Sequence, residues 1–246
     1  MDEAVSEDTL LDGRVRLLQP VEGYRVAIDP VLLAASVPVQ PGDRVLDIGA
    51  GVGAAAICLA AREPGCRIVG LEIDRLLVRL AGQNAILNGF GPRIEMVVGD
   101  ILHPPPRLAP SSYHHVMVNP PHIEAERGSP PEHAARAAAH IEGEARLSDW
   151  VRLALSMVRP KGTVTFIHRA DRLDALLAEL SQRIGELVVF PLWPGPAKPA
   201  KRIIVRGRKD VGTPTRLAPG LVMHAADGAY TTAAEAVLRH GASLAL

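Results

Sequence analysis

The chain has 246 residues, a length that suits one α/β domain with extensions or at most two small domains. Lysine and arginine together number 27, as do aspartate and glutamate, so the formal net charge of zero argues against indiscriminate nucleic-acid binding while allowing a local basic face. The acidic N-terminus does not read as a signal peptide and no apolar run approaches the length of a membrane span, so we expect a cytoplasmic protein.

Apolar strand patterns and helical patterns alternate along most of the chain. The predicted strands are residues 44–48, 67–73, 94–100, 114–119, 163–168, 186–193 and 201–207. The predicted helices are residues 49–63, which turn through glycine, then 74–89, 147–162 and 170–183. We expect Ser148 to cap the third of these helices, Pro160 and Gly162 to end it, and the polar residues 1–9 to fray. Strands that alternate with helices imply a mostly parallel sheet covered on both faces.

Polar side chains fall at the carboxyl ends of consecutive predicted strands, namely Asp47, Glu72, Asp100 and Asn119. In an open α/β sheet, ligands bind outside those ends, at the point where the strand order reverses. A simpler interpretation is that Asp47 caps a helix and Asp100 closes a turn. Because such residues recur at one strand end after another, we expect them to converge on a single crevice.

A glycine loop, with Gly49, Gly51 and Gly53, lies between the first strand and its helix, and its missing side chains let a ligand approach the backbone. The stretch also fits a dinucleotide fingerprint, in which a helix N-terminus faces a pyrophosphate, and Glu72 suits a ribose in either case. Asp47 favours a different ligand, because a carboxylate at the loop entrance repels phosphate and attracts an ammonium group. S-Adenosylmethionine (SAM) has an α-ammonium, a ribose and an adenine, and no phosphate.

Several motifs of the chain occur together in one known family. The motif Asp47-x-Gly49-x-Gly51-x-Gly53, the acidic residues Glu72 and Asp100, and the run Asn119-Pro120-Pro121 resemble those of class I SAM-dependent methyltransferases of the N-methylating branch. The segments "LLQPVEGYRVAIDPVLLAASVP", "QNAILNG" and "KRIIVRGRK" are similar to bacterial tRNA adenine-N6 methyltransferases, which act beside the anticodon of a valine tRNA. The likeness covers about residues 10–240.

The resemblance implies a fold and a division of the chain. We expect a Rossmann-like α/β fold, which is an open, mostly parallel sheet with helices on both faces, its last strand antiparallel, and a short N-terminal extension. Residues 1–40 form that extension and pack over the cofactor site, and residues 41–246 form the methyltransferase domain.

The resemblance also implies the cofactor-binding residues. These are Arg25, Asp47, Gly49, Gly51, Gly53, Glu72 and Asp100. Arg25 is expected near the methionine carboxylate, although a surface ion pair is an equal alternative, and Asp100 is expected to accept from the adenine amine. The two cysteines, Cys58 and Cys66, and the histidines show no metal-ligand spacing, so no metal is expected.

The catalytic residues implied by the resemblance are Asn119, Pro120, Pro121 and His122. The carboxamide oxygen of Asn119 would accept one N–H of the acceptor amine and the carbonyl of Pro120 the other, which aims the nitrogen lone pair at the methyl group. Prolines suit this corner because they fix the backbone that carries the carbonyl. The family usually places Tyr or Phe after the second proline, so His122 either stacks on the target base in its place or packs within the loop.

Substrate contacts are expected from basic residues in two regions. One is the polar insert 124–146, which is either a lid that orders over substrate or an ordinary surface loop. The other, residues 198–209, contains no acid, so it is either a phosphate-binding face or an edge strand protected by charge. The residues predicted to meet phosphates are Arg127, Arg136, Lys198, Lys201, Arg202 and Arg206.

The leading hypothesis is a SAM-dependent N-methyltransferase that acts on the N6 amine of adenine in structured RNA, with tRNA as the first candidate. Because other nitrogen methyltransferases share the Asn-Pro-Pro run, a protein glutamine and a small molecule are alternative substrates. A further alternative is a non-catalytic RNA-binding relative that keeps the fold. The oligomeric state stays open.

Overall fold

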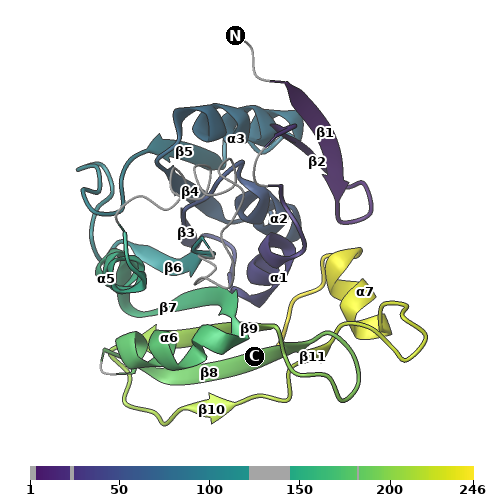
Figure 1. The fold of residues 1–246 in the computed structure, drawn as a ribbon. Coiled ribbons are helices and arrows are strands. Elements are labelled where there is room, and N and C mark those ends of the chain that lie inside the picture. Colours follow the sequence, from purple (N-terminus) through teal and green to yellow (C-terminus); the bar gives the residue numbers. More distant parts are fainter. Residues whose placement is uncertain (1–3, 23–24, 122–144, 182) are drawn as a thin grey trace, which may run out of the picture.

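A computed structural model describes residues 4–22, 25–121, 145–181 and 183–246 of the chain. Its strands form one nine-stranded sheet and a separate two-stranded hairpin (Figure 1). From one edge to the other, the main sheet contains β10 (Arg216–Leu217), β8 (Ile184–Trp193), β9 (Arg202–Lys209), β7 (Val158–Arg169), β6 (Tyr113–Val118), β3 (Arg44–Ile48), β4 (Arg67–Glu72) and β5 (Ile94–Val98), and β11 (Leu221–Val222) also pairs with β8. The hairpin joins β1 (Val5–Leu10) to β2 (Val15–Pro20).

The order and direction of the strands place the functional edge of the sheet. β5, β4, β3, β6 and β7 run parallel, whereas β9 is antiparallel to both of its long neighbours, β7 and β8. The chain leaves β3 toward β4 and β5 and then returns to the other side of β3 to form β6, so the strand order reverses there. The predicted Rossmann-like, mostly parallel sheet is therefore confirmed, and the reversal marks the carboxyl ends of β3 and β6 as the ligand site.

Helices cover both faces of this sheet, because the strand side chains alternate between two apolar layers. The first layer contains Val45 and Met117 and is covered by α1 (Asp29–Ser36), α2 (Ala54–Arg62), α3 (Arg75–Leu87) and α7 (Thr232–Leu238). The second layer contains Leu46 and Phe166 and is covered by α5 (Leu147–Met157) and α6 (Leu173–Leu180). Among the described residues, no helix combines the length and the apolar character needed to cross a membrane.

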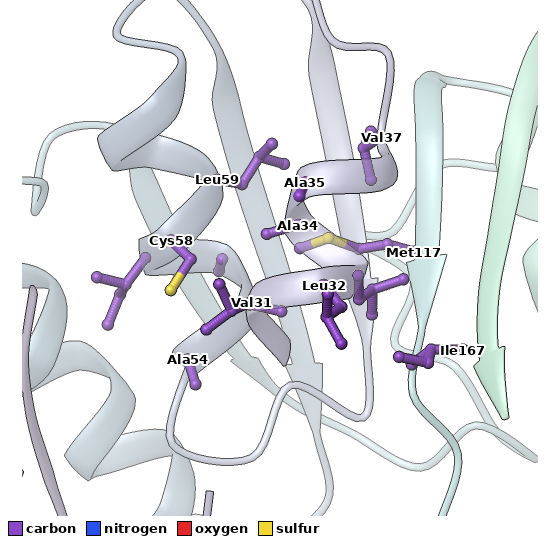
Figure 2. Packing of buried hydrophobic residues seen from close by; sticks show 14 of the residues in the cluster. Val31, Leu32, Ala34, Ala35, Val37, Ala54, Cys58, Leu59, Met117 and Ile167 are labelled. Carbon is purple, nitrogen blue, oxygen red and sulfur yellow. The ribbon is translucent and has the colours of Figure 1, made fainter. Parts of the chain in front are cut away.

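Figure 2 shows part of the first layer, where Val31 and Leu32 of α1 pack in the same cluster as Cys58 of α2 and Ile167 of β7. Both cysteines are free and buried, as expected for structural thiols. Burial raises the pKa of Cys58 to about 12, so this thiol stays protonated and acts as a small apolar side chain.

The start of the chain is ordered from residue 4 onward, so the prediction that residues 1–9 fray is wrong for the described part. β1 pairs with β2 along its length. The hairpin is tied to α3 by Asn84, whose Oδ1 accepts from Leu18 N at 2.7 Å and whose Nδ2 donates to Leu18 O at 2.9 Å. Asn84 also donates to Val52 O in the glycine loop, at 3.0 Å, so the extension and the loop share one buried side chain.

The predicted ends of the third helix are also wrong. Ser148 lies inside α5, and the helix is opened instead by Arg146, whose N–H donates to Asp149 Oδ2 at 2.8 Å. The helix ends at Met157 because Val158 already pairs with Tyr113 at the start of β7. Long-range strand pairing, which local sequence does not report, sets this boundary.

Candidate active site

The glycine loop connects β3 to α2 with all three glycines at positive φ, 72° for Gly49, 55° for Gly51 and 83° for Gly53. A Cβ on Gly49 would lie 2.8 Å from the ring of Trp150, and a Cβ on Gly53 would lie 3.1 Å from Cβ of Ala81. Among the described residues, no heavy atom beyond its chain neighbours lies within 4 Å of the corresponding position at Gly51. The loop is thus packed at both ends and open at its centre, where a ligand can reach the backbone.

Glu72, at the end of β4, holds the loop in place. Its Oε2 accepts from Gly51 N at 2.9 Å, and its Oε1 accepts from Ile73 N at 2.8 Å and Asp74 N at 3.0 Å. Each carboxylate oxygen can accept more than one hydrogen bond, so Oε2 keeps capacity for a further donor such as a hydroxyl. The side chain therefore supports the loop and remains available to a ribose.

Asp47, the fourth residue of β3, is only 2% exposed and lies under the start of α2. Its Oδ2 has no hydrogen-bond partner in the part of the chain that the structure describes. Burial, reinforced by the neighbouring charge of Glu72, raises the pKa of Asp47 to about 7, and the N–H of Ala56 only partly offsets this. A buried carboxylate with a vacant oxygen is a strong acceptor for a cation.

Asn119 follows the last residue of β6, directly beside the loop. Val118 is aligned with Ile48 in β3 and with Phe166 in β7, so Asn119 stands level with the first glycine of the loop. Its Oδ1 is buried and lacks a hydrogen-bond partner among residues 4–22, 25–121, 145–181 and 183–246. Pro120 is buried behind it. The register thus brings Asp47, Glu72 and Asn119 together at one edge of the sheet, as predicted.

Asp100 lies two residues beyond the end of β5, at the same edge. Its Oδ1 accepts from Leu102 N at 2.8 Å, which closes a turn, and its Oδ2 lies 3.4 Å from Nδ1 of His103. The side chain is partly exposed. One oxygen of Asp100 therefore closes a turn, as the simpler interpretation predicts, whereas the other makes only a long contact with His103.

The basic residues predicted to bind ligands make contacts within the protein. Arg25 pairs with Asp8 and donates to Ser6 Oγ at 2.9 Å on the hairpin, as in the ion-pair alternative. Arg202 Nε donates to Asp29 Oδ2 at 2.9 Å. Arg206 donates to two backbone carbonyls, Ser36 O and Leu246 O, each at 3.1 Å.

Other predicted residues are exposed or undescribed. Lys198 and Lys201 lie exposed on the loop between β8 and β9. His122, Arg127 and Arg136 fall outside the described residues. No group of histidine, cysteine and acidic side chains that could hold a metal ion occurs in the described part of the chain.

Sequence analysis missed two residues that support the loop. Trp150 packs against Gly49, and Asn84, which is fully buried, bonds to Val52 O. A buried asparagine on an amphipathic helix leaves one signal in the sequence, a polar residue on the apolar face. Nothing in the sequence connects Trp150, on a helix far along the chain, with this loop.

The methyltransferase small domain family matches residues 25–141. The tRNA1(Val) (adenine(37)-N6)-methyltransferase of Porphyromonas gingivalis is 30% identical over 217 residues, which cover 84% of each chain. The enzyme of the same name from Aeromonas hydrophila is 30% identical over 210 residues, covering 84% of this chain and 85% of its own. The chain belongs to this methyltransferase family. It is a SAM-dependent methyltransferase.

Solved structures of methyltransferases have the same fold. The crystal structure of a predicted O-methyltransferase from Agrobacterium tumefaciens matches with a TM-score of 0.74 and 25% identity, covering 89% of this chain and 99% of that one. TrmN from Thermus thermophilus matches with a TM-score of 0.51 and 22% identity, over 74% of this chain and 48% of its own, which supports the fold alone.

The residues present fit the cofactor of the family. In the part of the chain that the structure describes, Asp47 Oδ2 has no partner and so suits the α-ammonium of SAM, and the open backbone at Gly51 leaves room for the ligand. Glu72 has acceptor capacity for the ribose hydroxyls. Asp47, Glu72 and Asp100 are all acidic, and three carboxyl groups at one site disfavour a ligand with a phosphate and suit one with a positive charge.

Proposed function

We propose that this enzyme methylates the exocyclic N6 amine of an adenine in tRNA. The observation that carries the proposal is the buried Oδ1 of Asn119 at the end of β6, level with the glycine loop and without a hydrogen-bond partner among the residues that the structure describes. An acceptor held there without a partner suits an incoming N–H donor. The names of the relatives make adenine 37 of tRNA1(Val) the first substrate to test.

Bound SAM supplies a sulfonium methyl group whose displacement needs no acid catalyst. Asp47 would pair with the ammonium, Glu72 with the ribose hydroxyls and Asp100 with the adenine amine. The glycine loop would keep the cofactor against the sheet edge, with Trp150 and Asn84 fixing the loop from behind. Arg25, which pairs with Asp8 in this structure, would reach the methionine carboxylate only by exchanging that partner.

Asn119 and Pro120 would orient the acceptor amine. The lone pair of an exocyclic adenine nitrogen is delocalised into the ring, so the amine is a weak nucleophile. Two fixed acceptors, the Asn119 carboxamide and the Pro120 carbonyl, would hold its two N–H groups and turn the lone pair toward the methyl group. Pro121 would stiffen the corner, and His122 would lie beside the base.

The substrate strand would cross the same edge of the sheet. Lys198, Lys201 and Arg202 lie at that edge because β9 runs antiparallel and begins there. Arg127 and Arg136 would add contacts from the insert, whereas Arg206 lies farther along β9 and would act by packing the strand against α1. The proposal also implies that residues 1–40 support the cofactor site and that the enzyme works where tRNA is found, in the cytoplasm.

The deciding experiment follows methyl groups from radiolabelled SAM into bulk tRNA, ribosomal RNA and protein, offered in parallel. We expect label in tRNA, released by nuclease digestion as N6-methyladenosine, and no label in a valine tRNA transcript with guanine at position 37. Label only in protein would contradict the proposal in favour of a glutamine substrate. Because one solved relative is named a predicted O-methyltransferase, ribose-methylated nucleosides are the second product to measure.

A further inference from the structure

A surface groove outside the cofactor site has the composition of a nucleotide-binding surface. It has a volume of about 490 Å³ and is lined by Trp193 at the end of β8, by residues 195–199, and by Val222 of β11. The walls are apolar except for Lys198. Trp193 is partly exposed there, in contrast to Trp150, the other tryptophan, which is only 9% exposed.

The groove lies on the same edge of the sheet as Asn119. Leu192 is aligned with Arg202 in β9, and Arg202 with Arg169 in β7, which is three residues beyond Phe166, the partner of Val118. Trp193 is therefore close to the level of the Asn-Pro-Pro corner along the strands. Across the strands, three neighbour spacings separate β6 from β8, or about 14 Å. A few nucleotides of single strand span that distance.

Contacts from behind hold the groove walls in place. The Trp193 indole Nε1 donates to Pro219 O at 3.0 Å, which fixes the ring. His224 Nδ1 lies 2.9 Å from Pro194 O, and its ring stacks on Tyr230 with the centroids 4.6 Å apart. The prolines of the loop add stiffness. A wall that is already ordered costs little entropy when a ligand binds.

The charges around the groove favour an anionic strand. Lys198 and Lys201 are exposed on this loop, and Arg172 is exposed in the short helix η1 (Ala170–Arg172), which Ala170 N ties to Lys201 O at 3.1 Å. Two acids at the same edge, Asp29 and Asp171, are already paired with arginines. An otherwise neutral chain thus has a cationic margin beside an aromatic wall.

We propose that this groove binds an unpaired nucleotide a few positions along the strand from the methylated adenine, with its base stacked on Trp193 and its phosphate at Lys198. The side chains of the groove indicate its ligand, since an aromatic ring can stack on the face of any base and a lysine beside it can bind the phosphate. The inference rests on the proposed function for its choice of RNA. It adds a second recognition point, which selects single-stranded substrate near the target base.

Binding can be measured apart from catalysis through tryptophan fluorescence. We titrate the full chain with a short single-stranded RNA of anticodon-loop sequence, and expect quenching that disappears in Trp193→Phe. Trp193→Ala is expected to weaken RNA binding by about 5-fold to 100-fold, and Trp193→Phe by less, because phenylalanine still stacks. Lys198→Gln is expected to lower the slope of log affinity against log salt by about 0.7.

The matched control is Arg159→Gln, which removes one exposed positive charge near the start of β7, at the opposite edge of the sheet. RNA affinity should be unchanged in this variant, and the SAM Kd should be unchanged in all of them.

If wild-type enzyme methylates tRNA and the tRNA KM of Trp193→Ala and Lys198→Gln equals that of wild type, the groove inference is wrong while the function stands. If RNA quenches Trp193 but tRNA is not methylated, the groove is an RNA-binding surface and the proposed function is wrong. RNA that leaves Trp193 fluorescence unchanged overturns the groove inference.

Discussion

Buried oxygens without hydrogen bonds are costly, at about 1–3 kcal/mol each, and the described residues place two of them on neighbouring strands near this sheet edge. Asp47 Oδ2 and Asn119 Oδ1 come from neighbouring parallel strands and lack partners in the described part of the chain. Proteins retain such atoms where a ligand completes them. The two atoms suit the two reactants, because the Asp47 carboxylate can bind a cationic cofactor and the Asn119 carboxamide can accept from a neutral N–H donor.

Removing the carboxamide separates catalysis from cofactor binding. Asn119→Ala should lower kcat by about 100-fold or more, because one fixed acceptor for the amine is lost. The SAM Kd, measured by calorimetry, should stay within about 3-fold of wild type, since Asp47 and Glu72 hold the cofactor. Turnover equal to that of wild type would show that Asn119 does not orient the acceptor.

The raised pKa of Asp47, about 7, predicts a pH dependence of SAM affinity. Wild-type affinity should increase as pH rises through 7, since only the ionised carboxylate pairs with the ammonium. Asp47→Asn should bind SAM weakly and with little change between pH 6 and pH 8.5. Calorimetry across this range tests both statements, and a wild-type affinity that is flat with pH would contradict them.

The Asp47 carboxyl also affects the stability of the protein, but stability depends on pH in the opposite direction from SAM affinity. Its folded-state pKa lies above the ordinary value of 3.8, so the folded protein binds the proton more tightly and stability falls as pH rises from about 4 to about 7. Without SAM, Asp47→Asn should therefore increase the free energy of unfolding at pH 8, by up to about 4 kcal/mol, with the gain vanishing toward pH 4. Urea unfolding at both pH values measures it, and a variant less stable than wild type at pH 8 would refute the assignment of the buried charge.

At the scale of elements, the core strands could be predicted from the sequence, but the contacts between residues far apart in the sequence could not. β3 was predicted with its observed bounds, because a strand buried on both faces of a parallel sheet is a short apolar run. The hairpin, α1 and α7 were not predicted, since each owes its place to tertiary packing rather than to local pattern. The site followed from strand ends, but the partners of Arg202 and Arg206, which lie far away in sequence, did not.

Asn84 of α3 and Asn88, which caps the end of that helix, allow a matched test of the hairpin attachment. Asn84 and Asn88 make similar hydrogen bonds to Leu18 and Arg16 of β2, but Asn84 is fully buried and Asn88 is not. Asn84→Ala leaves the backbone groups of Leu18 and Val52 O unpaired away from water, so it should destabilise the protein by about 2–4 kcal/mol. Asn88→Ala should cost less than about 1 kcal/mol, because water can replace the lost bonds.

Because Val52 belongs to the glycine loop, Asn84→Ala should also weaken SAM binding, whereas Asn88→Ala should not. Chemical unfolding and SAM titration of the two variants provide the comparison. Equal losses of stability in both would mean that the hairpin attachment does not depend on burial.

At the scale of the whole molecule, the sheet has a polar network at each end. Opposite the ligand edge, His115 Nε2 lies 3.0 Å from Asp43 Oδ2 and His115 Nδ1 lies 2.7 Å from Thr163 Oγ1. These contacts join β6 to β7 and to the residue that precedes β3. In the described part of the chain, the ligand edge holds buried acceptors without partners, whereas His115 at the opposite edge has a partner for each ring nitrogen, so the two ends of the same strands serve binding and stability.

This network should make stability fall in acid. Burial lowers the pKa of His115 below its ordinary 6.5, with Asp43 opposing the shift, so the unfolded chain binds the proton more readily and stability decreases as pH falls below about 6.5. Relative to wild type, His115→Gln should therefore be more destabilising at pH 7.5 than at pH 5 in urea unfolding. Exposed His240 is the control, and His240→Gln should show no such difference. Equal destabilisation by His115→Gln at both pH values would contradict the coupling.

Because β9 runs antiparallel, the loop before it can contact substrate without also forming part of the cofactor pocket. The parallel strands β3, β4, β5 and β6 deliver their outgoing loops to the ligand edge and contribute to the cofactor pocket or the acceptor corner. The β8–β9 turn reaches that edge as a simple hairpin, outside the path that builds the pocket. Its length and residues can vary without moving Asp47, Glu72 or Asn119. Exchanging this turn between related enzymes is accordingly a route to new substrate ranges on an unchanged catalytic frame.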